Sequence, residues 1–437
     1  MANSKESDPL LTKDPTKNSE ENQVPRKTRW LIYMLMMLFG LASLLPWNMV
    51  ITATGYFAAK FAETQSSTIE EGFPSYFQIG GIASNVAVSL SSIVLFKYLP
   101  IKPVLITCNT LALVIFIVMT VMAKLSTTTW PMVFFILSNV LFCLVCCMSS
   151  AYTSGMMSMA SMILPSTVQG FILGQGTAGL VSTLLSIMTL SFPGINPVDA
   201  GFYYFLIATT ILSAALVAFI LFTKMDFVQK STLRSQEIER FRASSSASTI
   251  SANLEKPEIS AHAIFMRIVK YNLTSFTTLL ITLACFPAAL SALRTTQTTN
   301  LNSTWNQTYF QPVMTFLLFN IGDVLGRITS GVVTLPSKRW ILPISLLRIV
   351  FIPLIYMCNL QPRSIPVWFT ADIWPGVFSI LISWTNGHIL SLAASYCPQE
   401  VTKSSEKSLA GSFSAFSSAL GLVIGSLLVF PLLRIIK

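Results

Sequence analysis

A series of long apolar segments limits the fold of this 437-residue chain more than any other feature. Each segment can cross about 30 Å of hydrocarbon as a helix that rises about 1.5 Å per residue. A backbone in lipid must satisfy its own hydrogen bonds, so such segments predict helices. The sequence therefore predicts an all-α polytopic membrane protein with about 11 transmembrane helices, at 30–57, 74–98, 104–123, 131–154, 168–191, 200–223, 269–292, 308–334, 341–358, 368–395 and 408–433.

Composition and charge favour the same class of protein. Only 11% of the residues are charged, whereas a soluble domain is about one quarter charged. A net charge of +10 could indicate nucleic-acid binding, but the predicted segments place 20 of the 28 Lys and Arg residues on one side of the membrane and six on the other. This asymmetry follows the positive-inside rule. It predicts a cytosolic N-terminus, an extracellular or luminal C-terminus, membrane lipid as a partner and no nucleic acid.

The spacing of the segments divides the chain into four parts. Residues 1–29 form a polar cytosolic tail without the apolar region of a cleaved signal peptide. Residues 30–223 carry six predicted helices and residues 269–437 carry five. Between them, 224–268 is rich in Ser, Lys, Arg and Glu and cannot bury enough apolar surface to fold alone. We expect a largely disordered cytosolic linker between a six-helix and a five-helix bundle.

The eighth predicted helix carries a polar stripe. Steps of four, three and four residues place Phe316, Asn320, Asp323 and Arg327 on one face. An Asp and an Arg in a membrane helix cost several kcal/mol each unless they are paired or hydrated. The stripe must therefore face a water-filled cavity or the interior of the bundle, never lipid. It could bind a polar solute, or it could be a structural ion pair that fastens two helices.

Two further ionisable residues lie in predicted helices. Arg348 lies about 10 Å into the ninth helix from its cytosolic end, where it could act as a gate, tie helices together or contact a ligand. His388, in the triplet that begins at Asn386, is the only His in an apolar segment. A titratable group there could couple the protein to protons, or it could be a hydrogen-bonded residue at a helix end.

Several motifs that suggest enzymes do not fit their surroundings. Residues Gly174–Gly179 match a dinucleotide-binding fingerprint, but no strand precedes them, so the glycines favour close helix packing. The Cys143-x-x-Cys146 pair lies in a run too apolar for a redox or zinc site. The sequence has no phosphate-binding Walker loop and no cluster of metal ligands. We therefore expect no enzyme, no cofactor and no metal.

Ordered motifs along the chain resemble the equilibrative nucleoside transporters. They are Pro46-Trp47-Asn48, the Gly174–Gly179 stretch, the Phe319–Arg327 stretch, the run from Arg348 to Pro353, Asn386-Gly387, Ala410-Gly411 and Gly421-Leu422. The resemblance implies a six-plus-five two-bundle arrangement that resembles the major facilitator fold, with a central cavity between the bundles. It implies facilitative transport of nucleosides, with nucleobases an open option, by alternating access.

The resemblance also implies which residues contact the substrate. Leu44 and Trp47 would line the cavity beside the base, and Asp323 and Arg327 would meet the ribose. Phe316, Asn320 and Leu422 would adjoin them. The family often has a Gln in the fourth helix that addresses the base, whereas this chain has Ser154. A hydroxyl cannot offer the donor–acceptor pair of an amide, which leaves base preference open.

Other functions are compatible with the same motifs. The polyspecific organic-cation branch of the same family would be expected to carry extra acid in its cavity, and only Asp323 is predicted there. A proton-coupled nucleoside transporter of the family and a receptor or scaffold without transport activity are the further alternatives. Absence of an ATP-binding motif leaves the gradient of the solute, or of an ion, as the driving force.

Two kinds of short motif bear on location. The predicted external loop 293–307 holds glycosylation sequons at Asn302 and Asn306. The tail holds Glu6, Leu10 and Leu11, which resemble an acidic dileucine signal that one branch of the family uses to reach endolysosomes. We expect either the late endosomal or lysosomal membrane, reached through a sorting adaptor, or the plasma membrane.

Overall fold

The computed structural model describes residues 25–62, 67–163, 165–191, 196–226, 228–229, 261–296, 303–401 and 403–436. All regular secondary structure in these ranges is helical. The first part of the chain forms α2 (Arg26–Thr52), α3 (Thr54–Ala62), α4 (Ser67–Tyr98), α5 (Ile101–Lys124), α6 (Pro131–Ile163), α7 (Pro165–Ser191) and α8 (Pro197–Thr223).

The second part begins with α10 (Ala261–Cys285). It continues with α11 (Ala288–Ser291), η2 (Trp305–Tyr309), η3 (Pro312–Leu317), α12 (Leu318–Val332), α13 (Ile341–Leu347), η4 (Arg348–Val350), α14 (Phe351–Tyr356), α15 (Ile373–Tyr396), η5 (Cys397–Glu400) and α16 (Ser404–Ile436).

Ten helices among the described residues are long and apolar enough to cross a membrane. The eleventh predicted span is a shorter apolar helix, Ile341–Tyr356, which is broken into α13, η4 and α14. Pro353 explains the break, because it has no N–H to donate to the Ile349 carbonyl one turn earlier. The first predicted span is also divided, since α2 ends at Thr52 and α3 begins at Thr54.

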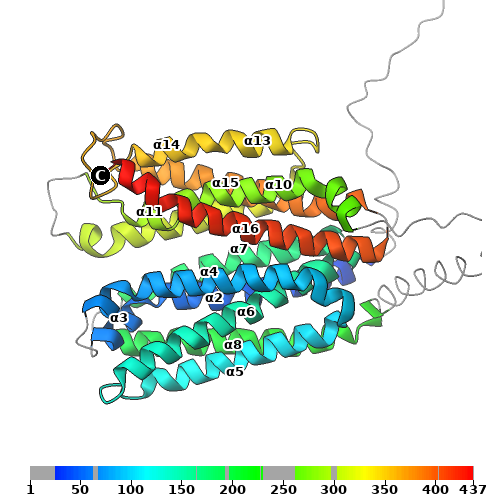
Figure 1. Ribbon diagram of the computed structural model, residues 1–437, viewed down its shortest axis with the longest axis horizontal. Helices are drawn as coiled ribbons and strands as arrows, with labels where there is room; N and C mark the ends of the chain where they lie inside the picture. The colour runs from blue at the N-terminus through cyan, green and yellow to red at the C-terminus, as the bar shows by residue number, and fades with distance from the viewer. Residues whose placement is uncertain are drawn as a thin grey trace, which may run out of the picture.

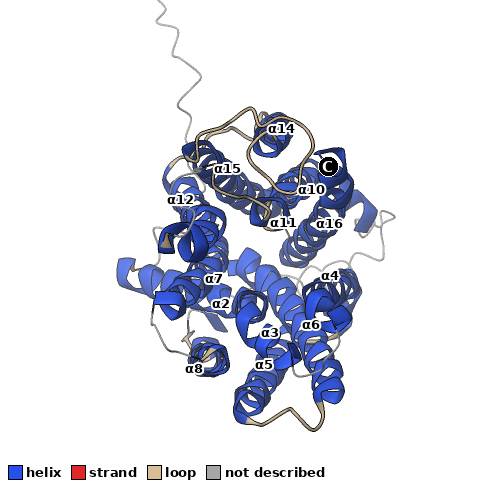
Figure 2. Cartoon of the chain, turned by 90° about the vertical axis from the view of Figure 1, so that its left-hand side faces the viewer, coloured by secondary structure: helices blue, strands red, loops and turns tan. Residues whose placement is uncertain are grey.

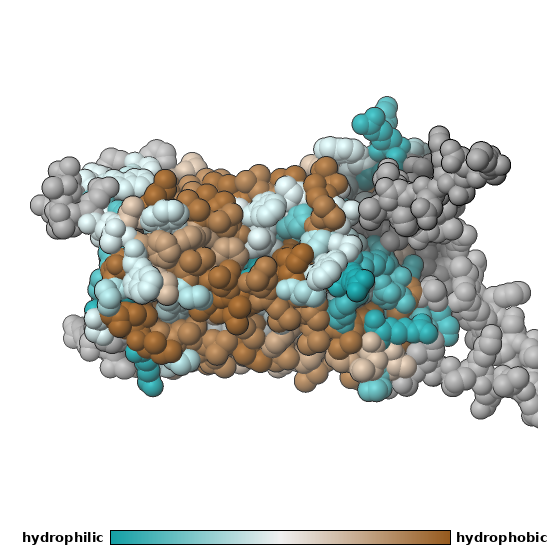
Figure 3. All heavy atoms as spheres, turned by 90° about the horizontal axis from the view of Figure 1, so that it is seen from above, coloured by the Kyte–Doolittle hydropathy of each residue, from teal (hydrophilic) through white to brown (hydrophobic). Residues whose placement is uncertain are grey.

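The helices form two groups that follow chain order (Figures 1 and 2). In the first group α2 packs on α7, α5 on α8 and α4 on α6. In the second, α12 packs on α15 and α10 on α16. The groups meet along two seams, where α7 contacts α12 and α15, and where α16 contacts α4 and α6. The outer surface is hydrophobic in its middle, and hydrophilic residues gather toward its ends (Figure 3).

Glycines on α2 and α7 bring these two helices into close contact. A Cβ atom on Gly40 would lie 1.9 Å from the Phe171 carbonyl oxygen, and one on Gly174 would lie 1.9 Å from the Met37 carbonyl oxygen. Backbone atoms cannot move aside at such distances, so only glycine fits at either position. This contact fixes the rotation of α7 and turns its next glycines, Gly176 and Gly179, toward α12.

Candidate functional site

A buried ion pair lies at the centre of α12. Arg327 Nε donates to Asp323 Oδ2 at 2.7 Å, and the two residues are 9% and 5% exposed. The opposite face of the helix carries exposed apolar residues, including Leu325 and Ile328. This division into a polar and an apolar face explains why the ion pair points into the protein rather than toward lipid.

The ion pair lies against α7 of the first group. Arg327 Nη1 donates to the Ile172 carbonyl oxygen at 2.7 Å. A Cβ atom on Gly176 would lie 2.6 Å from both Cδ and Nε of Arg327. The absence of a side chain at Gly176 therefore lets the guanidinium reach the backbone of α7. In this conformation the stripe faces the seam between α7 and α12, in the interior of the protein where the two helix groups meet.

One turn away, Asn320 crosses the same seam. Its Nδ2 donates to Thr183 Oγ1 at 2.9 Å and to the Phe316 carbonyl oxygen at 2.9 Å. A Cβ atom on Gly179 would lie 2.1 Å from Asn320 Oδ1. The last two glycines of the apparent dinucleotide fingerprint thus accommodate the polar stripe of α12.

A second set of contacts connects Asp323 to the interior of the second group. Asn386 Nδ2, on α15, donates to Asp323 Oδ1 at 2.7 Å. Thr282 Oγ1, on α10, lies 2.9 Å from Asn386 Oδ1. Arg348 Nη2 donates to Thr282 Oγ1 at 2.8 Å. Thr282 was not among the predicted site residues, although Thr274, Thr278 and Thr282 repeat every four residues on α10, all of them buried.

Arg348 is 3% exposed and has no carboxylate within salt-bridge distance among the described residues. Its Nη1 donates to the Thr278 carbonyl oxygen, its Nη2 also donates to the Ile382 carbonyl oxygen, and its Nε donates to Thr385 Oγ1. The guanidinium therefore lies in the interior and does not extend to the membrane surface. The described interior around Asp323 holds two guanidiniums and one carboxylate, which gives it a net positive charge.

Residues expected at the base lie mostly on the first group. Leu44 and Trp47 are half-buried on α2, and the Trp47 ring lies 5.4 Å from that of Phe142 on α6. Ser154 on α6 is fully buried, and its hydroxyl has no hydrogen-bond partner among the described residues. No hydrogen bond, ion pair or ring contact between described residues joins these three to Asp323 or Arg327.

Two apolar residues expected at the site lie on the second group. Phe316, in η3, is half-buried, and its ring lies 5.6 Å from that of Phe286 in an edge-to-face arrangement. Leu422 is half-buried on α16. The structure thus brings the polar stripe together with Asn386, and distributes the apolar residues over several helices.

His388 lies on α15, two residues after Asn386, but belongs to a different set of contacts. Its Nδ1 lies 3.0 Å from Thr329 Oγ1, and its Nε2 contacts the Leu335 carbonyl oxygen. The ring stacks on Trp384 at 5.6 Å. These contacts join the interior of α15 to Thr329 on α12 and to Leu335 just beyond α12, and none of them joins His388 to Asp323.

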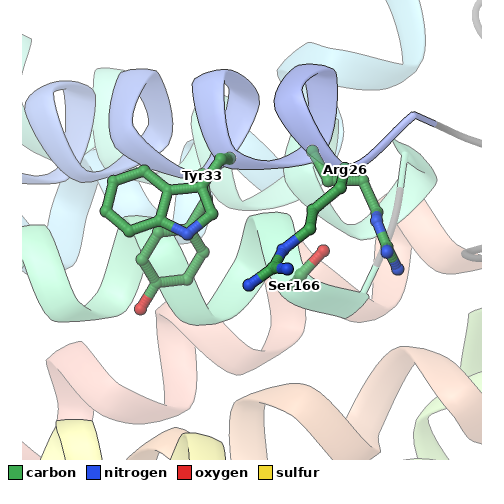
Figure 4. Close-up of a pocket in the computed structure, with 5 residues that line it drawn as sticks. Arg26, Tyr33 and Ser166 are labelled. Carbon is green, nitrogen blue, oxygen red and sulfur yellow. The ribbon is translucent and has the colours of Figure 1, made fainter.

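The remaining predicted positions are peripheral. Asn306 is half-buried in η2, whereas Asn302, Glu6, Leu10 and Leu11 lie outside the described residues. In the described ranges no group of three or more His, Cys, Asp or Glu residues is placed to hold a metal. A cavity of about 330 Å³ lies beside the first turns of α2 and α7 (Figure 4), away from the ion pair, and is lined by Arg26, Arg29, Trp30, Tyr33 and Ser166.

Comparisons with known proteins agree on one family. A family model described as nucleoside transporter matches residues 139–434. The chain is 26% identical to equilibrative nucleoside transporter 1 of Homo sapiens, over 94% of this chain and 98% of that protein. It is 25% identical to equilibrative nucleoside transporter 3 of Rattus norvegicus, over 90% and 87%. It is 26% identical to equilibrative nucleoside transporter 2 of Homo sapiens, over 93% and 97%.

Solved structures with a similar backbone are major facilitator proteins. The proton:xylose symporter XylE matches with a TM-score of 0.61 at 9% identity, over 93% of this chain and 88% of that one. FucP in its outward conformation matches with a TM-score of 0.58 at 12% identity, over 93% and 95%. At such low identity these matches show the fold, and they confirm the predicted major facilitator-like architecture.

Proposed function

Because the chain belongs to the nucleoside transporter family, we propose that it moves nucleosides across a membrane by facilitative transport with alternating access. Membership of this family confirms the resemblance predicted from the sequence, the multi-pass membrane class and the expectation that the protein is not an enzyme. The mechanism, the substrates within the family and the membrane are our proposals.

One observation carries the proposal: a buried, paired carboxylate and guanidinium lie where the two helix groups meet. A nucleoside offers hydroxyls that donate hydrogen bonds and ring atoms that accept them. Asp323 accepts from ribose hydroxyls, and Arg327 donates to hydroxyls or ring atoms. Such charge-assisted bonds fix the orientation of the solute in an otherwise apolar site.

The seam between α7 and α12 is the part that opens. Two hydrogen bonds, from Arg327 to Ile172 and from Asn320 to Thr183, cross it. When α12 moves away from α7, both polar groups lose partners, and a nucleoside supplies replacements. The substrate therefore stabilises the open seam, which is the differential binding that alternating access requires. In this scheme residues 30–223 and 269–437 move as two bundles joined by 224–268.

The net positive charge of the interior favours nucleosides over organic cations. Arg327 and Arg348 together outweigh Asp323, and the only buried acid in this network is already paired with Arg327. An organic cation would add a third positive charge in a medium of low dielectric constant, where like charges repel strongly. A neutral nucleoside adds none.

The wall contributed by the first group sets base preference. Leu44 and Trp47 supply apolar surface for the base, and the unpartnered Ser154 hydroxyl supplies one hydrogen bond. A single hydroxyl discriminates between bases less than an amide would, so we include nucleobases among the substrates. Phe316 and Leu422 complete the apolar lining.

Arg348, Asn386 and His388 act in gating, and His388 acts through its contacts rather than as a proton carrier.

We also propose the orientation and processing given by the sequence. The N-terminus is cytosolic and the C-terminus extracellular or luminal. Asn302 and Asn306 then lie outside, where they are glycosylation sites, and the Leu10-Leu11 signal directs the protein to late endosomes or lysosomes through an adaptor.

Replacing both leucines with Ala is expected to shift the protein to the plasma membrane, as fluorescence microscopy of a tagged chain would show.

Uptake into transporter-null cells tests the proposed function. Cells that display the protein with Leu10 and Leu11 replaced by Ala are expected to take up radiolabelled adenosine, uridine and hypoxanthine saturably, without concentrating them. Uptake should be similar at external pH 5.5 and pH 7.4, and tetraethylammonium should not enter. Absence of saturable uptake of all three compounds, with the protein shown at the surface, would exclude the proposal. Strong stimulation at pH 5.5 would instead favour proton coupling.

A further inference from the structure

We propose that Thr282 and Arg348 are positioning residues that act through Asn386 to hold the Asp323 carboxylate in its substrate-binding orientation. Four helical elements contribute to this chain of hydrogen bonds: Arg348 is in η4, Thr282 in α10, Asn386 in α15 and Asp323 in α12. The inference rests on the proposed function, and its first test measures transport. Its second test measures protein stability and does not depend on transport.

The direction of each hydrogen bond is set by chemistry. The ionised Asp323 carboxylate only accepts, so Asn386 must present its amide N–H₂ to Oδ1. The Asn386 carbonyl oxygen then faces Thr282 and requires a donor, which is the Thr282 hydroxyl. That hydroxyl in turn accepts from Arg348 Nη2, which only donates. The chain therefore runs from the cation to the anion in a single direction.

Thr282 has one proton and two acceptors within reach. Its Oγ1 lies 2.8 Å from the Thr278 carbonyl oxygen and 2.9 Å from Asn386 Oδ1. The Thr278 carbonyl already receives a hydrogen bond from Arg348 Nη1 at 2.8 Å. Because Arg348 Nη1 and the helical N–H of Thr282 together use both lone pairs of that carbonyl oxygen, the Thr282 proton is available to Asn386. Arg348 thus supports this series of hydrogen bonds in two ways. It donates to the Thr282 hydroxyl, and it donates to the Thr278 carbonyl that competes for the Thr282 proton.

Arg348 acts through other residues because its own donors are already used. Four of its N–H groups point at protein acceptors, namely the Thr278 and Ile382 carbonyls and the Thr282 and Thr385 hydroxyls. A guanidinium has five N–H groups, and Arg348 is 3% exposed. Few of its N–H groups are therefore free to donate to a ligand. One N–H group remains, so in this conformation Arg348 mainly orients its neighbours.

Asp323 needs support on both sides. Arg327 holds Oδ2, and Asn386 holds Oδ1. When the seam opens and Arg327 turns toward the substrate, Asn386 alone keeps the carboxylate plane fixed. A carboxylate with a fixed plane presents its remaining lone pairs in constant directions, which is what recognition of two adjacent ribose hydroxyls requires.

The first test compares two nucleosides that differ only in ribose hydroxyls. The wild type is expected to transport uridine at least about tenfold more efficiently than 2′,3′-dideoxyuridine, as kcat/KM, because the dideoxy compound lacks the 2′- and 3′-hydroxyls that donate to the carboxylate. Thr282→Val keeps the shape of the side chain and removes its hydrogen bonds. We expect this ratio to fall by about threefold or more in Thr282→Val and to return in Thr282→Ser.

Thr277→Val is the matched control. Thr277 lies on the same helix, and its hydroxyl contacts Ser345 Oγ and the Leu273 carbonyl oxygen rather than Asn386. Its uridine-to-dideoxyuridine ratio is expected to equal that of the wild type. Equal loss of both nucleosides in Thr282→Val, with an unchanged ratio, would overturn the proposal, since general damage to folding lowers both alike. Failure of Thr282→Ser to restore the ratio would overturn it as well.

The second test needs no transport. In purified protein, thermal midpoints of Thr282→Val, Asp323→Asn and the double variant are expected to be non-additive, because the two residues share one hydrogen-bonded chain. The cycle of Thr277→Val with Asp323→Asn is expected to be additive. Additivity in both cycles would overturn the proposal. If the wild type transports neither nucleoside, the proposed function fails, and this cycle alone decides the role of Thr282.

Discussion

Asp323→Ala is expected to abolish nucleoside uptake and to destabilise the fold more than Arg327→Ala does. Removing Asp323 leaves two buried guanidiniums without a counter-ion, and breaking a buried ion pair in this way costs about 3–5 kcal/mol. Removing Arg327 leaves Asp323 connected to Arg348 through Asn386 and Thr282, so the remaining charges balance. Both variants lose transport, because each removes a group that binds the solute.

Thermal unfolding of the purified variants and uridine uptake measure the two effects separately. The double variant Asp323→Ala/Arg327→Ala is expected to be more stable than Asp323→Ala, since it has one unpaired cation instead of two, and to remain inactive. A double variant that is stable and transports uridine normally would reduce the stripe to a structural ion pair. Equal stability of the two single variants would contradict the charge balance inferred for Arg348.

Gly176→Ala is expected to lower transport per surface-expressed molecule by about 10- to 100-fold. The added Cβ would lie 2.6 Å from Cδ and Nε of Arg327. The guanidinium must then leave Asp323, Ile172 or both. Each hydrogen bond to a charged group contributes about 1.5–3 kcal/mol, and about 1.4 kcal/mol corresponds to a tenfold change. Uridine uptake normalised to surface protein measures the effect.

Gly331→Ala is the control for this substitution. Gly331 lies on α12 one turn beyond Arg327, and a Cβ there would meet only Gln169 Oε1, at 3.7 Å, an ordinary contact. Ala also favours the helix over Gly, so the control is expected to transport normally and to be at least as stable as the wild type. Similar losses in both variants would show that transport is sensitive to any methyl group added on α7 or α12, and would remove the special role of Gly176.

The polar stripe was predictable from sequence because charged residues inside a membrane helix are rare and must be partnered. The four-residue spacing of Asp323 and Arg327 predicts that they pair, and the ion pair is present at 2.7 Å. Helix positions were predictable because the length of an apolar segment determines whether it can span a membrane. The division of α2 from α3 was not, because it depends on local backbone geometry.

The role of Thr282 was not predictable from the sequence alone. Thr and Ser residues are common in membrane helices, where most satisfy their hydroxyls on a carbonyl of the preceding turn. Only the placement of α10 beside α15 shows that Thr282 has a second acceptor in Asn386. The hydrogen bond from Arg327 to the Ile172 carbonyl oxygen across the seam was also not predictable. Every residue has a backbone carbonyl, so the sequence does not indicate which one Arg327 contacts.

Chemical labelling of Thr183→Cys tests most directly whether the seam between α7 and α12 opens to water. Thr183 is 2% exposed, and its hydroxyl accepts from Asn320 across that seam. We predict that a membrane-impermeant methanethiosulfonate added to cells will label this cysteine, and that saturating uridine will slow the labelling, while the unsubstituted chain shows no such protection. A cysteine that never reacts in active, surface-expressed transporter would contradict the account, because the seam would then stay closed throughout transport.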